Sequence, residues 1–166
     1  DLVLRIGDLP DDNLLAARRL AVFTNGLYAA PDYLAEHGEP QHPDELAMHQ
    51  AVRLLRGNGE PAPWTLRQGE QQWQGIAPGR ASANSPELLI RLARAGAGIA
   101  GVPDHSALPD VLQGRLRRVL PDWHLPSHTA WAVFPGRKLM PAKTRVFIEM
   151  LQVALAPVDA QNKNGL

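Results

Sequence analysis

The chain has 166 residues, of which 45% are apolar and 20% charged, as in an ordinary soluble globular protein of one domain or two small lobes. Its 17 Lys and Arg balance 17 Asp and Glu, so no overall charge draws it toward DNA or a membrane surface. The absence of cysteine excludes disulfides, thiolate chemistry and cysteine-ligated zinc, and no apolar run approaches the about 18 residues of a membrane span.

The N-terminal part of the chain is predicted to be mostly extended. Leu2–Ile6 is predicted as a strand closed by Gly7. Neither an initiator methionine nor a signal segment precedes it, so we expect a fragment of a longer protein. Residues 14–30 continue mostly extended. Two short helices, at 31–36 and 43–48, follow, because each opens with a proline.

Short strands are predicted in the middle of the chain. They occupy residues 51–55, 64–67, 71–76 and 80–83. The segment 57–79 is rich in glycine and proline, which favours loops and a hairpin between its two strands.

The stretch from Ser85 to Gly101 contains the pattern G-x-G-x-x-G of a dinucleotide-binding turn. That pattern requires a strand before it and a helix after it. Here a helix comes first, with Ser85 as N-cap and Pro86 at the first helical position. We therefore interpret Gly96 and Gly98 as the end of that helix, followed by a short buried strand at 99–102.

The remaining chain alternates helices and strands, which indicates an α/β fold with a substantial parallel component. In order these are a helix at 104–113, a strand at 115–119, a linker at 122–127, a strand at 130–134, a helix at 141–155 and a disordered tail at 158–166. Arg115, Arg117 and Arg118 are interpreted as the solvated face of a strand; the alternative is a nucleic-acid patch.

Catalytic and metal-binding patterns are poor. No serine lies in a nucleophile elbow. His124 and His128 have the spacing of a metal pair, but Pro126 between them favours a solvated linker. Other histidines lie beside turns, which favours solvated or capping roles: His37, His42 and His49. We predict no catalytic residue, no metal and no cofactor.

The helix start at Asn84 and Ser85 is the candidate binding feature. Free N–H groups and the positive end of the helix dipole can hold a carboxylate or another anion there. Self-capping by Ser85 or Asn84 explains the same residues without a ligand. From the residues alone both interpretations stay open.

Ordered sequence blocks resemble the effector-binding domain of LysR-type transcriptional regulators. They are D-L-V-L-R-I-G at the start with A-R-R-L at 17–20, A-A-P-D-Y-L-A-E-H-G-E-P at 29–40, P-D-E-L at 43–46 with His49, A-N through P-D at 83–104, G-R-L with L-P-D-W at 114–123, and Pro141, Lys143, Arg145 and Phe147. The blocks span residues 1 to about 155 in the family's order.

This resemblance implies a periplasmic-binding-protein-like (type II) fold of two α/β lobes joined by crossover strands. Residues 1–22 are then the end of the first half of lobe I, 23–130 a complete lobe II, 131–155 the return to lobe I with its C-terminal helix, and 156–166 a disordered tail. The family's winged helix-turn-helix and the opening strands of lobe I have no counterpart here. Lobe I is therefore expected to be partial, with an unpaired sheet edge.

The same resemblance implies a bacterial, cytoplasmic, effector-sensing domain that binds a small, anionic ligand between its lobes. The residues expected at the cleft are Asn84, Ser85, Ile6, Gly7, Val52 and Arg53. Arg53 either pairs with the effector or is a solvated strand arginine.

In the full-length family, dimers or tetramers are expected, with the helix at 86–95 packing on a partner subunit. Operator DNA is then contacted only through the missing N-terminal domain, and no membrane is involved. A transport solute-binding protein of the same fold is the alternative function, and an enzyme is a third.

Overall fold

The computed structural model describes residues 2–7, 9, 15–135 and 141–155. The predicted disordered tail at 158–166 lies outside these residues. The chain forms two compact units, one of Asp1–Phe23 with His128–Leu166 (unit 1) and one of Thr24–Ser127 (unit 2). Two long strands, β2 (Leu15–Ala29) and β9 (Leu125–Pro135), each run from one unit into the other.

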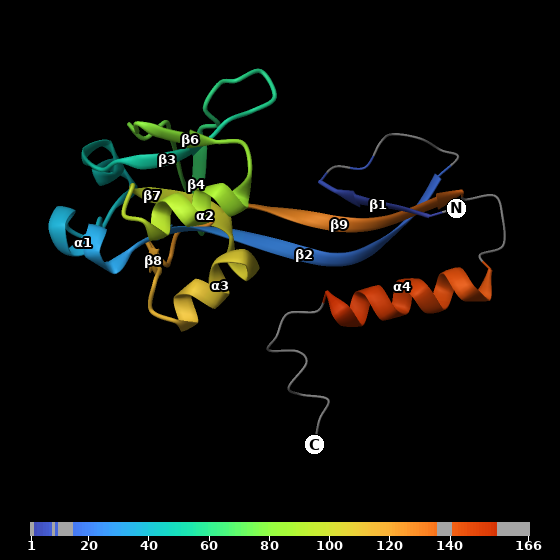
Figure 1. Cartoon of the computed structure of the whole chain (residues 1–166). Coiled ribbons are helices and arrows are strands. Elements are labelled where there is room, and N and C mark those ends of the chain that lie inside the picture. The colour runs from blue at the N-terminus through green and yellow to red at the C-terminus, as the bar shows by residue number, and fades with distance from the viewer. Residues whose placement is uncertain (1, 8, 10–14, 136–140, 156–166) are drawn as a thin grey trace. The chain divides into compact units, whose positions relative to one another are not determined.

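Unit 2 contains a twisted mixed sheet (Figure 1). Within it, β3 (Ala51–Leu54) pairs in parallel with β6 (Ala81–Ala83) and β7 (Ile99–Pro103). The unit 2 end of β2 is antiparallel to β7 and to β8 (Arg117–Val119). The parallel component expected from the sequence is therefore confined to three neighbouring strands, because β2 enters this sheet from the opposite direction.

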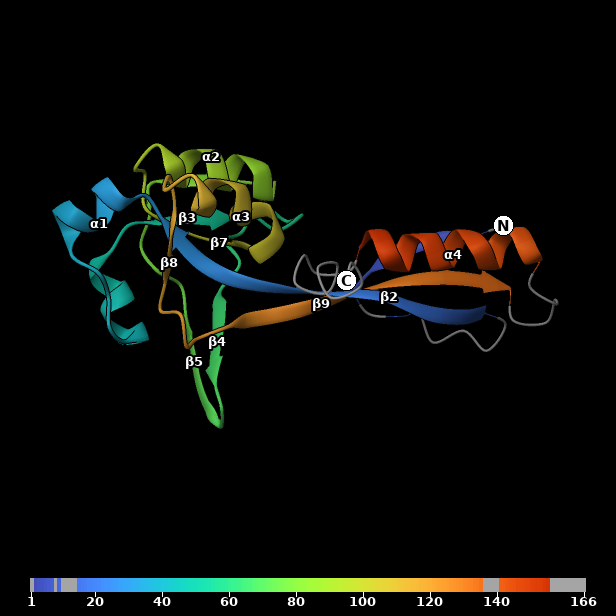
Figure 2. The same cartoon turned by 90° about the horizontal axis from the view of Figure 1, so that it is seen from below.

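The two faces of this sheet are covered by different elements (Figure 2). Helices α2 (Pro86–Arg94) and α3 (Asp104–Leu112) pack on the face that contains Val52 and Ala100. The opposite face contains Ala51 and Ile99. Against it pack the hairpin of β4 (Trp64–Gln68) and β5 (Gln71–Gly75), the helix α1 (Pro31–His37) and the 3-10 helix η1 (Pro43–Met48). Successive strand residues point to opposite faces, which separates the two cores.

The expected end of α2 is confirmed. Gly96 has a φ of 81°, and the amides of Gly96 and Ala97 donate to the carbonyls of Ala93 and Leu92. Gly98 has a φ of 140°, and its backbone packs against the carbonyl of Gln50, so a side chain there has no room. These glycines end a helix and admit a close strand contact, as the order of elements predicts.

Unit 1 is a small sheet covered by one helix. Strand β1 (Val3–Ile6) pairs antiparallel with β9, and α4 (Ala142–Ala154) packs through Ile148 on Ala130 and Ala132. All four residues of β1 are exposed, and β1 is the last strand on its side of the sheet among the described residues.

One local prediction is wrong, and the type of one predicted helix is specified by the structure. The segment 122–127 is not all linker, because β9 begins at Leu125; His124 pairs with Arg67, and the Pro126 carbonyl accepts a hydrogen bond from Asn25. The predicted helix at 43–48 forms as a 3-10 helix. In the described part of the chain, no helix has the length and apolar character needed to cross a membrane.

Candidate functional site

The start of α2 is capped by its own side chain. Ser85 has extended backbone angles, and its Oγ accepts a hydrogen bond of 3.3 Å from the amide of Leu88. Pro86 has no N–H, and the Leu89 amide donates to the Ser85 carbonyl. The Leu88 and Leu89 amides thus have acceptors. Among the described contacts of the first turn, only the backbone amide of Glu87 has no acceptor. The self-capping interpretation is confirmed for Ser85, and fewer helix donors remain for an anion than four free amides provide.

Arg53 is the expected site residue at the carboxyl end of β3. Arg53 pairs in register with Ser82 of β6, and Ser82 is two residues before Asn84 in the chain. Its Nε is buried and has no hydrogen-bond partner, and among the described residues no carboxylate pairs with its guanidinium. A half-buried guanidinium without an acceptor is costly, and an anionic ligand satisfies both its charge and its donors.

Parallel strands bring these groups to one edge of the unit 2 sheet. The carboxyl ends of β3, β6 and β7 meet there, and the register places Asn25 of β2 opposite Pro103. Arg53, Asn84 and Ser85 therefore belong to the same edge, which is where open α/β sheets bind ligands. Asn84 is exposed and Ser85 partly exposed, so both are accessible.

The other expected site residues differ in their surroundings. Val52 is 0% exposed and packs in the core under α2, so its side chain is not available to a ligand. Ile6 and Gly7 belong to unit 1. Ile6 is 68% exposed, and the Gly7 carbonyl accepts a hydrogen bond of 3.1 Å from Trp131 Nε1.

A polar network centred on Asp104 was missed by the sequence analysis. Tyr28 and Arg118 donate to Asp104 Oδ1 at 2.7 and 2.6 Å, and Thr24 donates to Oδ2 at 2.6 Å. Burial, followed by the hydrogen bond to Asp104, raises the pKa of Tyr28 to about 12. Arg118 is half-buried, so the prediction of a solvated strand face is wrong for this residue. The sequence signal that was available is Gly26, whose missing side chain leaves room for the guanidinium.

His49 was also misassigned, because it is buried rather than solvated. The hydroxyl of Tyr33 accepts the Gln50 amide at 2.9 Å and shares a hydrogen bond of 3.2 Å with His49 Nδ1. Burial lowers the pKa of His49, and the nearby His37 lowers it further. His42, by contrast, accepts the Asp44 amide as a cap, as one of the predicted roles requires.

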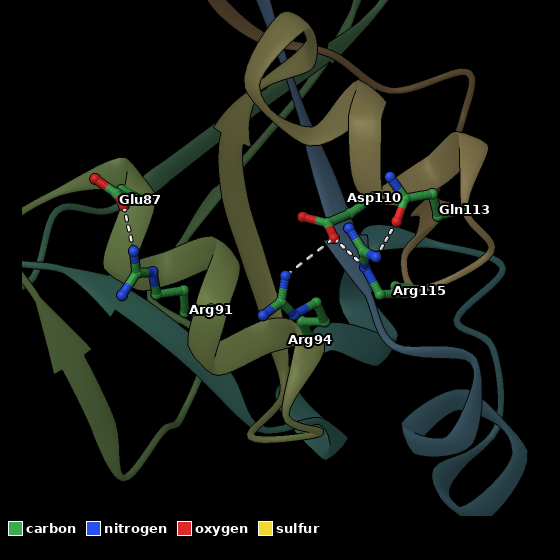
Figure 3. A network of polar contacts seen from close by, with 6 residues as sticks. All are labelled: Glu87, Arg91, Arg94, Asp110, Gln113 and Arg115. Carbon is green, nitrogen blue, oxygen red and sulfur yellow. Dashed lines mark hydrogen bonds and ion pairs between the residues drawn. The ribbon is translucent and has the colours of Figure 1, made fainter.

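A buried carboxylate joins α2, α3 and the following loop (Figure 3). Asp110 Oδ1 accepts Arg94 Nη1 at 3.3 Å and Arg115 Nε at 2.5 Å. Burial alone raises the pKa of Asp110, but the hydrogen bonds and charges of Arg115 and Arg94 outweigh it and leave the pKa below its ordinary 3.8. We call Asp110 with Arg94 and Arg115 the Asp110 clamp. A hollow of about 360 Å³ lies beside it, lined by Glu87, Ile90, Arg91, Arg94, Ser106, Pro109 and Asp110.

This hollow offers little free charge. Arg91 pairs with Glu87 at 2.6 Å, and Arg94 pairs with Asp110. Over the described residues, no three His, Asp or Glu side chains lie close enough to hold a metal ion. Of these two places, the carboxyl edge of the sheet suits an anion better than the hollow between α2 and α3, because it contains the unpaired Arg53.

A family model described as LysR substrate binding domain matches residues 1–156. The chain belongs to this family. The resemblance seen in the sequence blocks is thereby confirmed. Over 158 residues the chain is 35% identical to an HTH-type transcriptional regulator of Xanthomonas campestris pv. campestris (strain 8004). The aligned region covers 93% of this chain and 46% of the relative.

Solved structures of LysR-type regulatory domains have the same fold. The regulatory domain of AphB from Vibrio vulnificus matches with a TM-score of 0.78 and 26% identity, over 93% of this chain and 75% of that one. The CrgA regulatory domain from Neisseria meningitidis matches with a TM-score of 0.68 and 31% identity, over 94% and 76%. The expected α/β, periplasmic-binding-protein-like two-lobe fold class is confirmed.

The LysR-type domain described here spans about half the length of the curated relatives it matches. Its family is an effector-binding domain and is not normally catalytic. The relatives named above are transcriptional regulators, so the comparisons do not support the alternative of a transport solute-binding protein.

Proposed function

We propose that this chain is the effector-sensing part of a bacterial LysR-type transcriptional regulator and that it binds a small anionic ligand at the carboxyl edge of the unit 2 sheet. The observation that carries the proposal is the unpaired guanidinium of Arg53 beside the start of α2. Arg118, by contrast, already pairs with Asp104 at 2.6 Å, and Arg94 and Arg115 pair with Asp110.

The donors around Arg53 suit a carboxylate. Arg53 supplies the charge and a fork of N–H groups. The exposed Asn84 supplies a side-chain amide, and the Ser85 hydroxyl proton is free because its oxygen accepts the Leu88 amide. The Glu87 amide completes the set. Val52 contributes through the core that supports β3.

Unit 1 contributes Ile6 and Gly7 in this proposal, as the family resemblance implies. Segments 1–22 and 131–155 then belong to lobe I and 23–130 to lobe II. A ligand that binds the closed arrangement of the lobes more tightly than the open one shifts the equilibrium toward the closed arrangement. In this way a ligand alters the activity of a transcription factor.

The whole protein is proposed to act in the cytoplasm. It forms a homodimer or homotetramer in this proposal, with α2 at a subunit contact, and reaches operator DNA through a winged helix-turn-helix outside this chain. The DNA-binding part of this proposal is supported by the relatives, which are HTH-type transcriptional regulators.

The test measures the thermal stability of the chain with acetate, succinate, benzoate, sulfate and phosphate. A ligand that binds only the folded state raises the melting temperature, and the rise grows with the logarithm of the ligand concentration once that exceeds the Kd. Arg53→Gln is expected to abolish the rise given by the best anion. The double variant Asn84→Ala, Ser85→Ala is expected to weaken it.

Ser85→Asp separates capping from ligand binding. Aspartate is as good an N-cap as serine, so the helix keeps its cap, while its negative charge repels an anion. Ser85→Ala removes the cap, which costs about 1 kcal/mol of stability. Gln72→Glu on the exposed β5 adds the same charge elsewhere and serves as the control. An anion response that survives both Arg53→Gln and Ser85→Asp contradicts the proposed site.

A further inference from the structure

Both strands that connect the units are fastened by side chains at the point where they enter unit 2. On β2, Thr24 Oγ1 donates to Asp104 Oδ2 at 2.6 Å. On the next residue, Asn25 Nδ2 donates to the carbonyl of Pro126 on β9 at 2.6 Å, and Asn25 is 7% exposed. The boundary between the units falls between Phe23 and Thr24 and between Ser127 and His128. Both bonds therefore lie within two residues of it.

The acceptor of the first bond is held firmly inside unit 2. Asp104 is the first residue of α3, and its other oxygen accepts both Tyr28 and Arg118. The Arg118 guanidinium lies against Gly26, which is two residues after Thr24 on β2. The ion pair with Arg118 holds this half-buried carboxylate in its orientation, so Thr24 is bound to a fixed point that does not depend on the neutral donor Tyr28.

The second bond joins the two connecting strands to each other. Pro126 has no N–H, so its carbonyl is the group through which it contacts Asn25. Because Asn25 is buried, the loss of its acceptor would leave an unsatisfied amide, which makes the bond costly to break. The unit 2 ends of β2 and β9 therefore move as one body.

We propose that two hydrogen bonds, Thr24–Asp104 and Asn25–Pro126, hold the unit 2 ends of β2 and β9 in place, so that the hinge between the units lies on their unit 1 side. We call these two bonds the pins. Rotation of one unit against the other is absorbed by backbone torsions on the unit 1 side of Thr24 and Pro126. Hinges are a few element-terminal residues that absorb torsion changes, and pinned residues are excluded from them. The proposal concerns chain flexibility and holds whether or not an anion binds near Arg53.

Thr24→Val is the variant that tests the pins. Valine has the shape of threonine without the hydroxyl, and Thr24 is exposed, so the fold is retained. Tyr28→Phe is the matched control, because it also removes one donor from Asp104 but lies deeper in unit 2. The whole chain is compared by hydrogen exchange and by spin-label distances. Gln72→Cys and Glu149→Cys carry the labels, since the chain has no cysteine of its own.

In Thr24→Val, the amides of residues 24–26 and 126–128 are expected to exchange about tenfold faster, because loss of one hydrogen bond to a charged group raises local opening by about that factor. The label distance distribution is expected to broaden. Tyr28→Phe is expected to leave both measurements at the junction unchanged.

Equal effects of Thr24→Val and Tyr28→Phe at the junction, or no effect of Thr24→Val, overturn the proposal. Asn25→Asp tests the second pin independently, because it replaces the donor by an oxygen of the same size. If that variant unfolds, its melting curve shows it, and Thr24→Val alone decides the outcome.

Discussion

The guanidinium of Arg118 occupies the space that a side chain at Gly26 would need. The three Arg118 atoms Cζ, Nη1 and Nε are the nearest neighbours of a Cβ built on Gly26. This contact lets Arg118 lie along β2, reach Asp104 at 2.6 Å and stack over the Tyr28 ring at 5.3 Å. A glycine on β2 is thus needed for the half-buried polar network around Asp104.

Gly26→Ala is therefore expected to destabilise the fold. The added methyl group displaces Arg118 and leaves Asp104 with fewer donors, a loss of about 1–3 kcal/mol. Urea unfolding measures the change. Gly57→Ala is the control, because no atom lies within 4 Å of a Cβ at Gly57. Equal stability of the two variants would show that Arg118 relocates without cost.

The Asp104 network also predicts an unusual tyrosine titration. The chain has two tyrosines, and burial, as the first cause, raises the pKa of both Tyr28 and Tyr33 above 10, Tyr28 to about 12. Ultraviolet titration is expected to show little tyrosinate at pH 10 in the folded chain and about half in urea. Asp104→Asn is expected to bring one tyrosine closer to its ordinary pKa.

The sign of the linkage follows from the raised pKa values. The folded state binds more protons than the unfolded state above about pH 10, so stability is complete below that pH and is lost as the pH rises through the folded values. Titration of both groups at their ordinary pKa in the folded chain would contradict the buried network.

Asp110→Asn is expected to weaken the connection of α2 to α3. The asparagine keeps one acceptor but loses the charge that faces Arg94 and Arg115, at a cost of about 1–3 kcal/mol. The measurement is the free energy of unfolding in urea near pH 7. The exposed Asp122→Asn serves as control.

The depressed pKa of Asp110 gives a second readout of the same pair. The clamp contributes stability that is complete above its ordinary pKa of 3.8 and is lost as the pH falls through the folded value. Acid unfolding of Asp110→Asn is therefore expected to lack part of the pH dependence seen in the unmodified chain. An unchanged pH profile would show that the two arginines contribute no net stabilisation.

His49 predicts a loss of stability in mild acid. Burial, and then the charge of His37, lowers its pKa below the ordinary 6.5, although Glu45 acts in the opposite direction. The unfolded state binds the proton more readily, so stability is complete above pH 6.5 and falls as the pH drops below it.

The measurement is the free energy of unfolding between about pH 7.5 and 5.5. His49→Gln keeps an acceptor for Tyr33 and is expected to flatten the pH dependence. The exposed His128→Gln is the control and is expected to leave it as it is. A slope that persists in His49→Gln would assign the pH dependence to other groups.

Local signals in the sequence account for most elements of the fold. Ser85 and Pro86 predicted the start of α2, and Gly96 its end, because caps and prolines act within a few residues. The same local reasoning failed at 122–127, since β9 begins there through pairing and through the bond from Asn25, which is 101 residues away in the sequence. Element ends that depend on distant partners carry little local signal.

The candidate site divides in the same way. The capping role of Ser85 was readable from three adjacent residues, whereas the placement of Arg53 opposite Ser82 depends on the register of β3 with β6. Val52 shows the limit of a position-by-position resemblance: one residue along a strand changes which face a side chain occupies, and Val52 lies in the core under α2.

The family, the order of helices and strands, and the start and end of α2 could all be predicted from the amino-acid sequence, because they follow from ordered motifs and from interactions between near neighbours. Only the tertiary structure decided that Thr24, Tyr28 and Arg118 meet at Asp104 and that His49 is buried. Those contacts join residues up to 90 positions apart, and their energies arise from burial and from charges that lie close together only in the folded chain.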